Sequence, residues 1–211
     1  MNKLSTCNLF LVRHGESQGN ANGLWQGHKD YHLTKKGEHQ AFLTKRSLTN
    51  VSFDKLQTSD LTRSIQTIKI ICNNYSKPIE IEPNWKELHF GYWEGKSTQE
   101  INQESNLLDL WYKNPSEAKI PGGESFLQLQ DRVIKAYNKL CKQIHRSEYK
   151  NVLLVAHGGT IRVLACYLTG IPLSNLWRLR VKHCSIARIL VTYEKSTLAS
   201  WNQTNHLENI S

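Results

Sequence analysis

Two short apolar segments of this 211-residue chain each end in a histidine followed by a glycine. The first spans residues 9–12 (LFLV) and continues as Arg13-His14-Gly15-Glu16, and the second spans residues 152–156 (VLLVA) and continues as His157-Gly158-Gly159. Short continuous apolar runs of this kind are typical of strands buried on both faces of a parallel sheet. Ligands of open α/β sheets bind at the carboxyl ends of neighbouring strands. We therefore expect both imidazoles at one crevice, with an anion, most simply phosphate, as the ligand.

Composition limits the size and the location of the protein. Hydrophobic residues make up 39% of the chain, which is enough for a full core, and no linker or repeat divides it. We expect a single domain over residues 1–211. The N-terminal apolar run is too short for a signal peptide and no segment approaches a membrane span, so we expect a cytoplasmic protein. The five cysteines are odd in number and widely spaced, which favours reduced thiols over disulfides.

The charge of the chain favours anionic partners. The formal net charge is +9, from 27 Lys and Arg against 18 Asp and Glu. The basic residues form separate clusters, at 35–36, 45–46 and 178–182, without an RNA-binding or helix-turn-helix signature, so solvated helix faces explain most of them. We therefore expect a small phosphorylated substrate as the partner, and neither nucleic acid nor a membrane.

Strand patterns and helix patterns alternate along the whole chain. Further strands are predicted over residues 53–57, 79–82, 185–193 and 198–202, and a long loop over 16–32. Helices are predicted over 33–48 with Thr34 at its start, from a Ser59 cap to about Cys72, and over 160–168. Two capping boxes, Ser97 with Glu100 and Ser125 with Gln128, predict a short helix and a long one. This order predicts an α/β fold, a three-layer sandwich with a mostly parallel central sheet flanked by helices.

Five motifs in this order resemble those of the histidine phosphatase (phosphoglycerate mutase-like) superfamily. They are LVRHGESQGN, SDLTRSIQT, KELHFGYWEGKS, PGGESF and LLVAHGGTIRVL, and together they cover nearly the entire chain. Within the superfamily the chain is most similar to the small phosphatases, in particular the α-ribazole phosphatase group. The stretches VSFDKLQTSDLTRS, FGYWE and IPLSNLWRLRVKHCSI carry this narrower similarity. The resemblance implies the phosphoglycerate mutase-like fold and hydrolysis of a phosphate monoester through a phosphohistidine.

The residues at these motifs suit that reaction. His14 is the candidate nucleophile, because a neutral imidazole attacks phosphorus well and a phosphohistidine divides the displacement into two steps. We expect Arg13, Arg63 and His157 to surround the non-bridging oxygens. These fixed donors would neutralise the phosphate charge, which is the role of Mg²⁺ in many phosphoryl-transfer enzymes. Gly158, beside His157, completes this part of the expected phosphate site. The chain has no HExxH, DxD or His-x-His pattern, so we expect neither a metal nor another cofactor.

A general acid must protonate the leaving alkoxide, and the same group can later activate water. Two carboxylates in the aromatic loop, Glu87 and Glu94, are candidates for this role, and the resemblance implies the first. The alternative for either residue is a solvated loop carboxylate without a catalytic role.

The loop that follows His14 supplies candidate substrate contacts. Ser17 and Asn20 can donate hydrogen bonds to phosphate, and Gln26-Gly27 resembles a family position that touches substrate; the alternative is that these residues are solvated loop. Several large rings could form a rim suited to a ring-bearing phosphate, or could belong to the core. They are Trp25, His28, Trp93, Trp111 and Tyr112.

Three functions remain to be separated. The first is a metal-independent phosphomonoesterase acting on α-ribazole 5′-phosphate or another small metabolite. The second is a phosphoglycerate mutase; mutases of this family carry an adjacent arginine pair after the acid loop, whereas residues 94–124 offer only Lys96, Lys113 and Lys119. The third is a non-catalytic phosphate-binding adaptor, which the joint presence of all five catalytic candidates disfavours. A homodimer stays open, because the tail over residues 201–207 can pack inward or pair with another chain.

Overall fold

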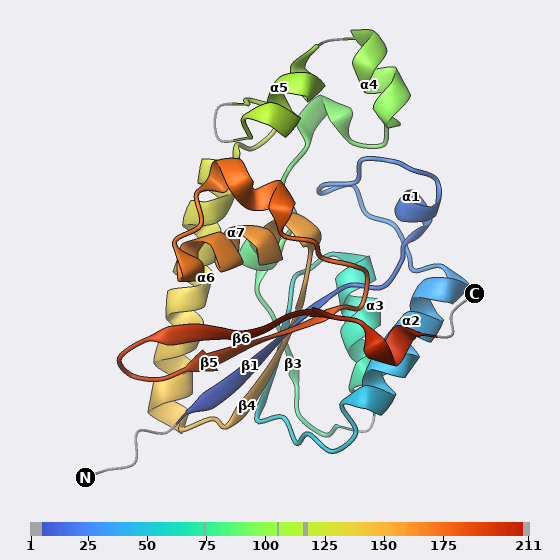
Figure 1. Cartoon of the computed structure of the whole chain (residues 1–211). Helices are drawn as coiled ribbons and strands as arrows, with labels where there is room; N and C mark the ends of the chain where they lie inside the picture. Colours follow the sequence, from blue (N-terminus) through green and yellow to red (C-terminus); the bar gives the residue numbers. More distant parts are fainter. Residues whose placement is uncertain (1–5, 74, 105, 116–117, 209–211) are drawn as a thin grey trace.

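A six-stranded sheet runs through the middle of the computed structural model, which describes residues 6–73, 75–104, 106–115 and 118–208 (Figure 1). The strand order is β3-β2-β4-β1-β5-β6. The strands are β1 (Cys7–Arg13), β2 (Lys55–Thr58), β3 (Ile79–Ile81), β4 (Asn151–Ala156), β5 (Ile186–Val191) and β6 (Ser196–Gln203). Strands β1 to β4 are parallel, while β5 pairs antiparallel with both β1 and β6. The four parallel strands therefore end at one edge of the sheet.

Helices cover both faces of this sheet. Figure 1 shows α2 (Lys35–Ser47) and α3 (Thr62–Ile71) on one face and α6 (Phe126–Ser147) and α7 (Gly158–Thr169) on the other. The predicted three-layer α/β sandwich with a mostly parallel sheet is confirmed. No helix in the described part of the chain is long and apolar enough to cross a membrane.

The central strands β1 and β4 face two separate hydrophobic cores. Leu9 and Leu11 point into the core under α6 and α7, whereas Val12 belongs to the core under α3. In β4, Leu154 belongs to the first core and Leu153 to the second. Each fully buried apolar side chain of this size contributes about 1.5–3 kcal/mol, so both faces of these strands stabilise the fold. This two-sided burial explains why both segments are apolar without interruption.

Capping explains where most helices begin. The Thr34 side chain accepts a hydrogen bond from the Gly37 amide, and both predicted capping boxes, at Ser97 and at Ser125, are present. The prediction for Ser59 is wrong, because α3 starts at Thr62 after a Leu61 cap without a side-chain bond. The Ser59 hydroxyl instead contacts His157. Ser59 therefore belongs to the candidate site and is not a helix cap.

Three short helices, α1 (Gln18–Ala21), α4 (Thr98–Glu104) and α5 (Leu107–Lys113), lie at the carboxyl ends of the strands, and the sequence predicts only one of them. The predicted loop over 16–32 contains α1, which Ser17 and Asn20 start with a capping box. Beyond α3 and the aromatic loop, α4 is the short helix predicted by the Ser97 box, and α5 was not predicted. Figure 1 shows α1 on one side of the strand ends and α4 and α5 above them. These elements enclose the space into which the two His-Gly segments open. Four 3₁₀ turns complete the described chain: Pro83–Trp85, Gly91–Trp93, Leu173–Arg178 and Asn205–Leu207.

Candidate active site

The ends of β1 and β4 bring the two predicted histidines together. The strands pair in register up to Arg13 and Ala156, and the His14 amide donates to the Ala156 carbonyl at 3.0 Å. The ring centroids of His14 and His157 are 5.1 Å apart. Two segments that are separated by more than half of the chain therefore meet at one point because parallel strands end together.

His14 is held with one ring nitrogen free to react. Its Nδ1 lies 2.7 Å from the Gly15 carbonyl oxygen. A carbonyl only accepts hydrogen bonds, so Nδ1 carries the proton and Nε2 keeps its lone pair. Burial, with the positive charge of Arg63 next in importance, lowers the pKa of His14 well below its usual value of 6.5. The imidazole is therefore neutral near pH 7, as a nucleophile must be.

Backbone packing around Gly15 fixes this position. A β-carbon on Gly15 would lie 2.5 Å from the Gly37 carbonyl oxygen, at the start of α2, so only glycine fits here. The Gly15 amide also donates to the Thr67 hydroxyl at 3.0 Å. The turn that directs His14 is thus bound to both α2 and α3.

His157 is the N-cap residue of α7 and is fully buried. Its Nε2 lies 2.7 Å from the Ser59 hydroxyl, while its Nδ1 is buried with no hydrogen-bond partner among the described residues. Burial, followed by the charges of Arg63 and Arg13, lowers the pKa of His157 well below 6.5. Because Ser59 occupies Nε2, Nδ1 is the ring nitrogen that is left to bond to a phosphate oxygen.

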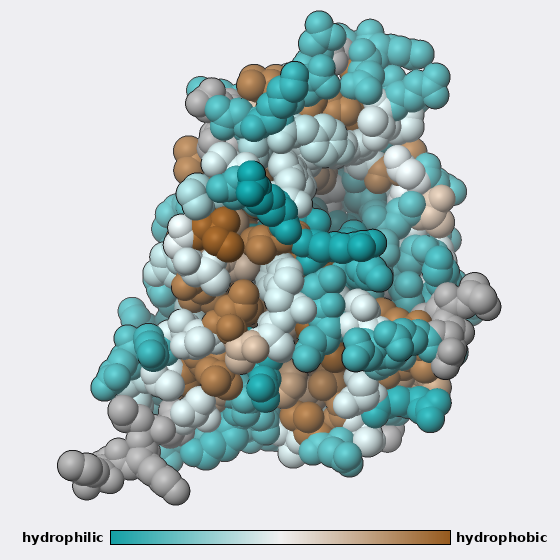
Figure 2. All heavy atoms as spheres, viewed as in Figure 1, coloured by the Kyte–Doolittle hydropathy of each residue, from teal (hydrophilic) through white to brown (hydrophobic). Residues whose placement is uncertain are grey.

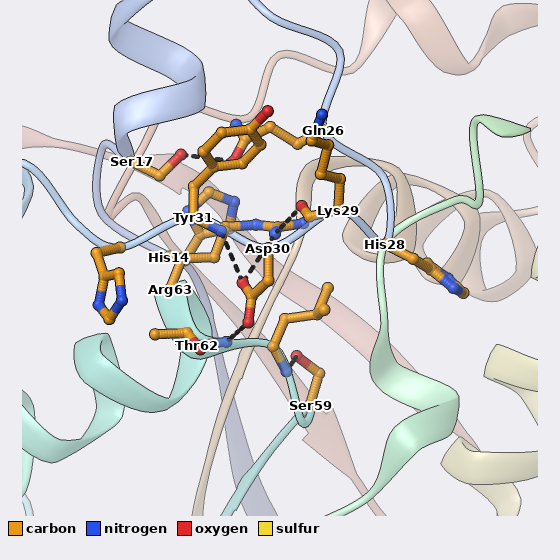
Figure 3. A network of polar contacts seen from close by, with 12 residues as sticks. His14, Ser17, Gln26, His28, Lys29, Asp30, Tyr31, Ser59, Thr62 and Arg63 are labelled. Carbon is orange, nitrogen blue, oxygen red and sulfur yellow. Dashed lines mark hydrogen bonds and ion pairs between the residues drawn. The ribbon is translucent and has the colours of Figure 1, made fainter. Parts of the chain in front are cut away.

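Two arginines place positive charge beside these rings. Arg63 lies in the first turn of α3 and is 1% exposed. It donates to the Gly27 carbonyl at 2.7 Å and lies 3.4 Å from Asp30. Figure 3 shows Arg63 with Asp30 and His14. Arg13 donates to the Val181 carbonyl at 2.8 Å. The Nε atoms of both arginines are buried without a partner in the described part of the chain. Burial lowers the pKa of Arg13 to about 10, so this side chain stays protonated at neutral pH.

A cavity of about 290 Å³ opens over these groups, and Figure 2 shows the molecular surface hollowed between the upper helices and the α1 segment. The predicted catalytic and phosphate-binding residues that line it are Arg13, His14, Asn20, Gln26, Gly27, Arg63 and Glu87. Ser17, Gly158 and His157 are not part of this lining. Asn20 and Gln26 therefore remain candidate substrate contacts.

Ser17 lies behind the cavity wall. It is fully buried, and its hydroxyl donates to Gln26 Oε1 at 2.7 Å, so it is a positioning residue for Gln26 in this structure (Figure 3). Gly158 is likewise buried, and a β-carbon there would lie 3.1 Å from Arg162 Nη1. The expected direct contacts of Ser17 and Gly158 with phosphate are not visible in this arrangement.

The two candidate acids have different environments. Glu94 accepts hydrogen bonds from the amides of His28, Lys29 and Phe90 at 2.7–3.0 Å, so it holds two loops together. Glu87 lines the cavity with His14, and the Gly159 amide donates to its two carboxyl oxygens at 2.9 and 3.1 Å. Only Glu87 is therefore placed to exchange a proton with a group bound in the cavity.

The aromatic residues divide between the core and the cavity. Trp93 and Trp111 are 4% and 3% exposed and belong to the core. Trp25 and Tyr112 line the cavity, together with Phe90. Of the five rings predicted for the rim, only Trp25 and Tyr112 therefore line the cavity. His28 Nε2 donates to the Glu87 backbone carbonyl at 2.9 Å and positions the acid loop.

Sequence reasoning missed three residues near His14. Ser59 follows the end of β2, so the rule that ligands gather at parallel strand ends could have identified it. The ring of His183 lies 5.8 Å from that of His14, and Arg162 lies beside Arg13 across Gly158. Neither has a strand-end signal in the sequence. Among the described residues, no group of three or more His, Cys, Asp or Glu is arranged to hold a metal.

Comparison with known proteins agrees with this geometry. The family model of the histidine phosphatase superfamily (branch 1) matches residues 9–204. The chain is 32% identical over 195 residues to the adenosylcobalamin/alpha-ribazole phosphatase of Escherichia coli, covering 92% of this chain and 95% of the relative. It is also 32% identical over 189 residues to the "Probable phosphoglycerate mutase GpmB" of Escherichia fergusonii, covering 89% and 86%.

A solved structure supports the same assignment. A phosphoserine phosphatase mutant from Entamoeba histolytica, in complex with phosphoserine, superposes with a TM-score of 0.84 at 26% identity, covering 95% of this chain and 99% of that one. The family match spans both His-Gly segments, the α3 arginine and the acid loop. The chain belongs to branch 1 of the histidine phosphatase superfamily.

Proposed function

We propose that the protein is a metal-independent phosphomonoesterase that works through a phosphohistidine on His14. One observation carries the proposal: a buried, neutral imidazole has its proton on Nδ1 and its Nε2 free, close to the positive charges of Arg13 and Arg63. Phosphate monoesters hydrolyse so slowly that a catalyst must lower the barrier by more than about 20 kcal/mol. Covalent catalysis and fixed positive charge together address that barrier.

In the first step, His14 Nε2 attacks phosphorus and the bond to the ester oxygen breaks. The leaving alkoxide takes a proton from the Glu87 carboxyl group. Arg13 and Arg63 neutralise the non-bridging oxygens, and His157 Nδ1–H donates to one of them. Backbone carbonyls hold the two arginines and the Ser59 hydroxyl holds His157, so these groups need little reorganisation as charge develops.

In the second step, water gives a proton to the Glu87 carboxylate and attacks the phosphohistidine. The phosphorus–nitrogen bond breaks, inorganic phosphate leaves, and His14 returns to its neutral form. One carboxyl group thus acts first as acid and then as base, which its position in the His14 cavity allows.

For the substrate, we favour a small phosphorylated metabolite, with α-ribazole 5′-phosphate as the first candidate. The 32% identity to a protein named alpha-ribazole phosphatase supports this choice. So does the cavity wall, since Trp25, Phe90 and Tyr112 offer ring faces beside the phosphate end. Phosphoserine belongs in the same test because a related structure holds it.

A phosphoglycerate mutase is the alternative that the relatives' names raise. A mutase must retain its phosphohistidine and bind a second acidic group, which calls for additional cations near the substrate. Among the described residues between 94 and 124, only Thr98 and Tyr112 line the cavity, and Lys96 pairs with Glu104. This part of the wall favours hydrolysis over transfer.

The direct test is hydrolysis of a generic aryl phosphate in the presence of a chelator. We expect wild type to release phosphate and His14→Ala to lose at least about a thousandfold in kcat. A panel of α-ribazole 5′-phosphate, phosphoserine and 3-phosphoglycerate, ranked by kcat/KM, then assigns the substrate. Equal rates for wild type and His14→Ala would remove the nucleophile. Phosphoryl transfer between phosphoglycerates without release of phosphate would instead establish the mutase.

A further inference from the structure

A second and larger cavity lies on the other side of Arg13. Its volume is about 690 Å³, and Arg13 lines both this cavity and the one that contains His14. The remaining walls come from α2, from Arg162 of α7, from the segment between the 3₁₀ turn at 173–178 and β5, and from the C-terminal turn. Arg180, Lys182 and the residues of the C-terminal turn have no role in the phosphate chemistry at His14. We call this space the basic cavity.

Positive charge dominates the lining of the basic cavity. Among the described residues that line it, the cationic side chains are Arg13, Lys36, Arg162, Arg180 and Lys182, and the one carboxylate is Glu208. Arg180 and Lys182 are exposed, and neither forms an ion pair within the described part of the chain. Lys36 forms an ion pair with Glu16, with 3.3 Å between Lys36 Nζ and Glu16 Oε2. The lining therefore carries an uncompensated excess of positive charge, which focuses anions into a concave site.

Two guanidinium groups meet at the inner end of this cavity. A β-carbon on Gly158 would lie 3.1 Å from Arg162 Nη1 and 3.5 Å from Arg13 Nε, so both groups lie against the same glycine. Arg162 is anchored from behind, because its Nε donates to the Leu179 carbonyl at 2.7 Å and its guanidinium lies over the Trp177 ring at 5.5 Å. The two positive charges repel each other, and the carboxylate of Glu87 offsets this repulsion in part. A bound anion would offset it further. Fixing two such groups before a ligand arrives favours binding of a planar or tetrahedral oxyanion.

A third group with an unused hydrogen-bonding atom lines the same cavity. His183 Nε2 is buried and has no partner among the described residues. Its ring lies 5.8 Å from the His14 ring, so His183 lines the basic cavity and lies close to the nucleophile. A buried, unpaired ring nitrogen in a residue that lines a cationic cavity is a further donor or acceptor for a bound ligand.

We propose that the basic cavity is a second oxyanion site, for a phosphate-class anion held by Arg162, Arg180 and Lys182 and linked to the catalytic phosphate through Arg13. The site itself is independent of the proposed function, whereas its effect on turnover rests on that function. The anion has two possible sources: free phosphate, or a second phosphate group of the substrate itself. A free phosphate competes for the charge of Arg13 and weakens ester binding. A second phosphate on the substrate gains the added cations and strengthens it.

The binding test uses inorganic phosphate and equilibrium dialysis. We expect two phosphates per chain for wild type and one for the double variant Arg180→Gln/Lys182→Gln, with at least about tenfold weaker binding at the lost site. The matched control is Lys142→Gln/Arg146→Gln, which removes the same charge from exposed positions of α6 and should still bind two. A stoichiometry of one in wild type, or equal loss in both double variants, would overturn the proposal. Because binding is read directly, the result holds even if the enzyme does not hydrolyse the esters tested.

A kinetic comparison identifies the source of the anion. KM is measured for 1,4-butanediol monophosphate with and without added phosphate, and for 1,4-butanediol bisphosphate. Inhibition by phosphate that curves upward in wild type and becomes linear in Arg180→Gln/Lys182→Gln indicates a free anion. A KM at least about tenfold lower for the bisphosphate, lost in the same variant, indicates a substrate group. If wild type shows linear inhibition and equal KM values, no second oxyanion acts at this site.

Discussion

The tautomer of His14 decides which of its nitrogens can react. The Gly15 carbonyl accepts a hydrogen bond from Nδ1–H, and burial together with the nearby arginines keeps the ring from gaining a second proton. The 2.7 Å hydrogen bond between His14 Nδ1 and the Gly15 carbonyl thus fixes the tautomer and orients Nε2 as the nucleophile. The same logic applies to His157, whose orientation depends on the Ser59 hydroxyl.

Ser59→Ala tests this dependence. Removing the hydroxyl leaves His157 Nε2 unpaired in a fully buried position, which should lower the free energy of unfolding by about 1–3 kcal/mol. It should also lower kcat/KM by about tenfold, because the ring is no longer held for phosphate. Denaturant unfolding and steady-state kinetics measure the two effects.

The matched control is Ser64→Ala. The Ser64 hydroxyl is equally buried but donates to the Val155 carbonyl, away from the histidines. We expect this variant to lose stability and to keep kcat/KM. If both serine variants have the same activity, His157 does not depend on Ser59.

At this scale the sequence predicts some positions better than others. Arg13, His14, Arg63 and Glu87 line one cavity, as motif order and strand ends indicate. The position of Ser17 could not be predicted, because its hydroxyl is taken by Gln26 through a contact that depends on how the whole loop folds.

Among the elements, α7 connects the second histidine to the acid. The helix begins at Gly158, two residues before the predicted start, and its Gly159 amide binds the Glu87 carboxylate. Helix N-termini favour anions, so a helix that starts directly after His157 orients both the donor and the acid.

Gly159→Ala tests this arrangement. A β-carbon there would lie 2.4 Å from Glu87 Oε1, so the carboxyl group must move. We expect kcat to fall by about a hundredfold with little change in KM, because proton transfer suffers more than phosphate binding. Kinetics with an ester of poor leaving group measure this most clearly.

Gly170→Ala, at the other end of the same helix, is the control. Gly170 has φ +72° and open space around it, so the substitution costs about 1 kcal/mol of stability without touching the cavity. It should leave kcat unchanged. An equal loss of kcat in both variants would point to a general effect on α7 instead of a displaced Glu87.

The predictability of an element follows from its length and its burial. Strands β1 and β4 and the long helix α6 were predicted because each has a continuous or periodic apolar pattern. Helices α1 and α5 are four and seven residues long, too short for a pattern to repeat. Their positions depend on contacts with the rest of the fold.

For the whole molecule, buried histidines connect folding to pH. Burial lowers the pKa of His14 and His157 well below 6.5 and that of His183 to about 2, whereas the unfolded chain protonates all three near 6.5. Below that pH the unfolded state binds more protons than the folded state, so stability is highest above pH 6.5 and falls as pH decreases toward the folded values.

Each such histidine contributes a slope of up to about 1.4 kcal/mol per pH unit to this loss. We expect chemical denaturation between pH 7 and 5 to show it, and His183→Asn to reduce the slope. His39→Gln, at an exposed position, serves as the control and should keep it. A stability that is flat over this range would contradict the neutral state of these rings.

Assembly and charge also belong to this scale. The tail packs inward, since His206 Nε2 donates to the Cys184 carbonyl at 3.1 Å, yet β6 remains the edge strand of the sheet. A homodimer therefore stays possible. The single domain over residues 1–211, the cytoplasmic location and the absence of nucleic-acid and membrane partners stay predictions. Part of the positive charge behind the net charge of +9 lies in the lining of the basic cavity.

The most direct test of the account is detection of the phosphohistidine in Glu87→Gln. An aryl phosphate needs little help from an acid in the first step, but the second step lacks its base, so the intermediate should accumulate. We predict that alkaline quench and peptide mass spectrometry find close to one phosphate per chain, on His14, with turnover lowered by about a hundredfold or more. Wild-type turnover in this variant, or a phosphate found on another residue or on none, would contradict the mechanism.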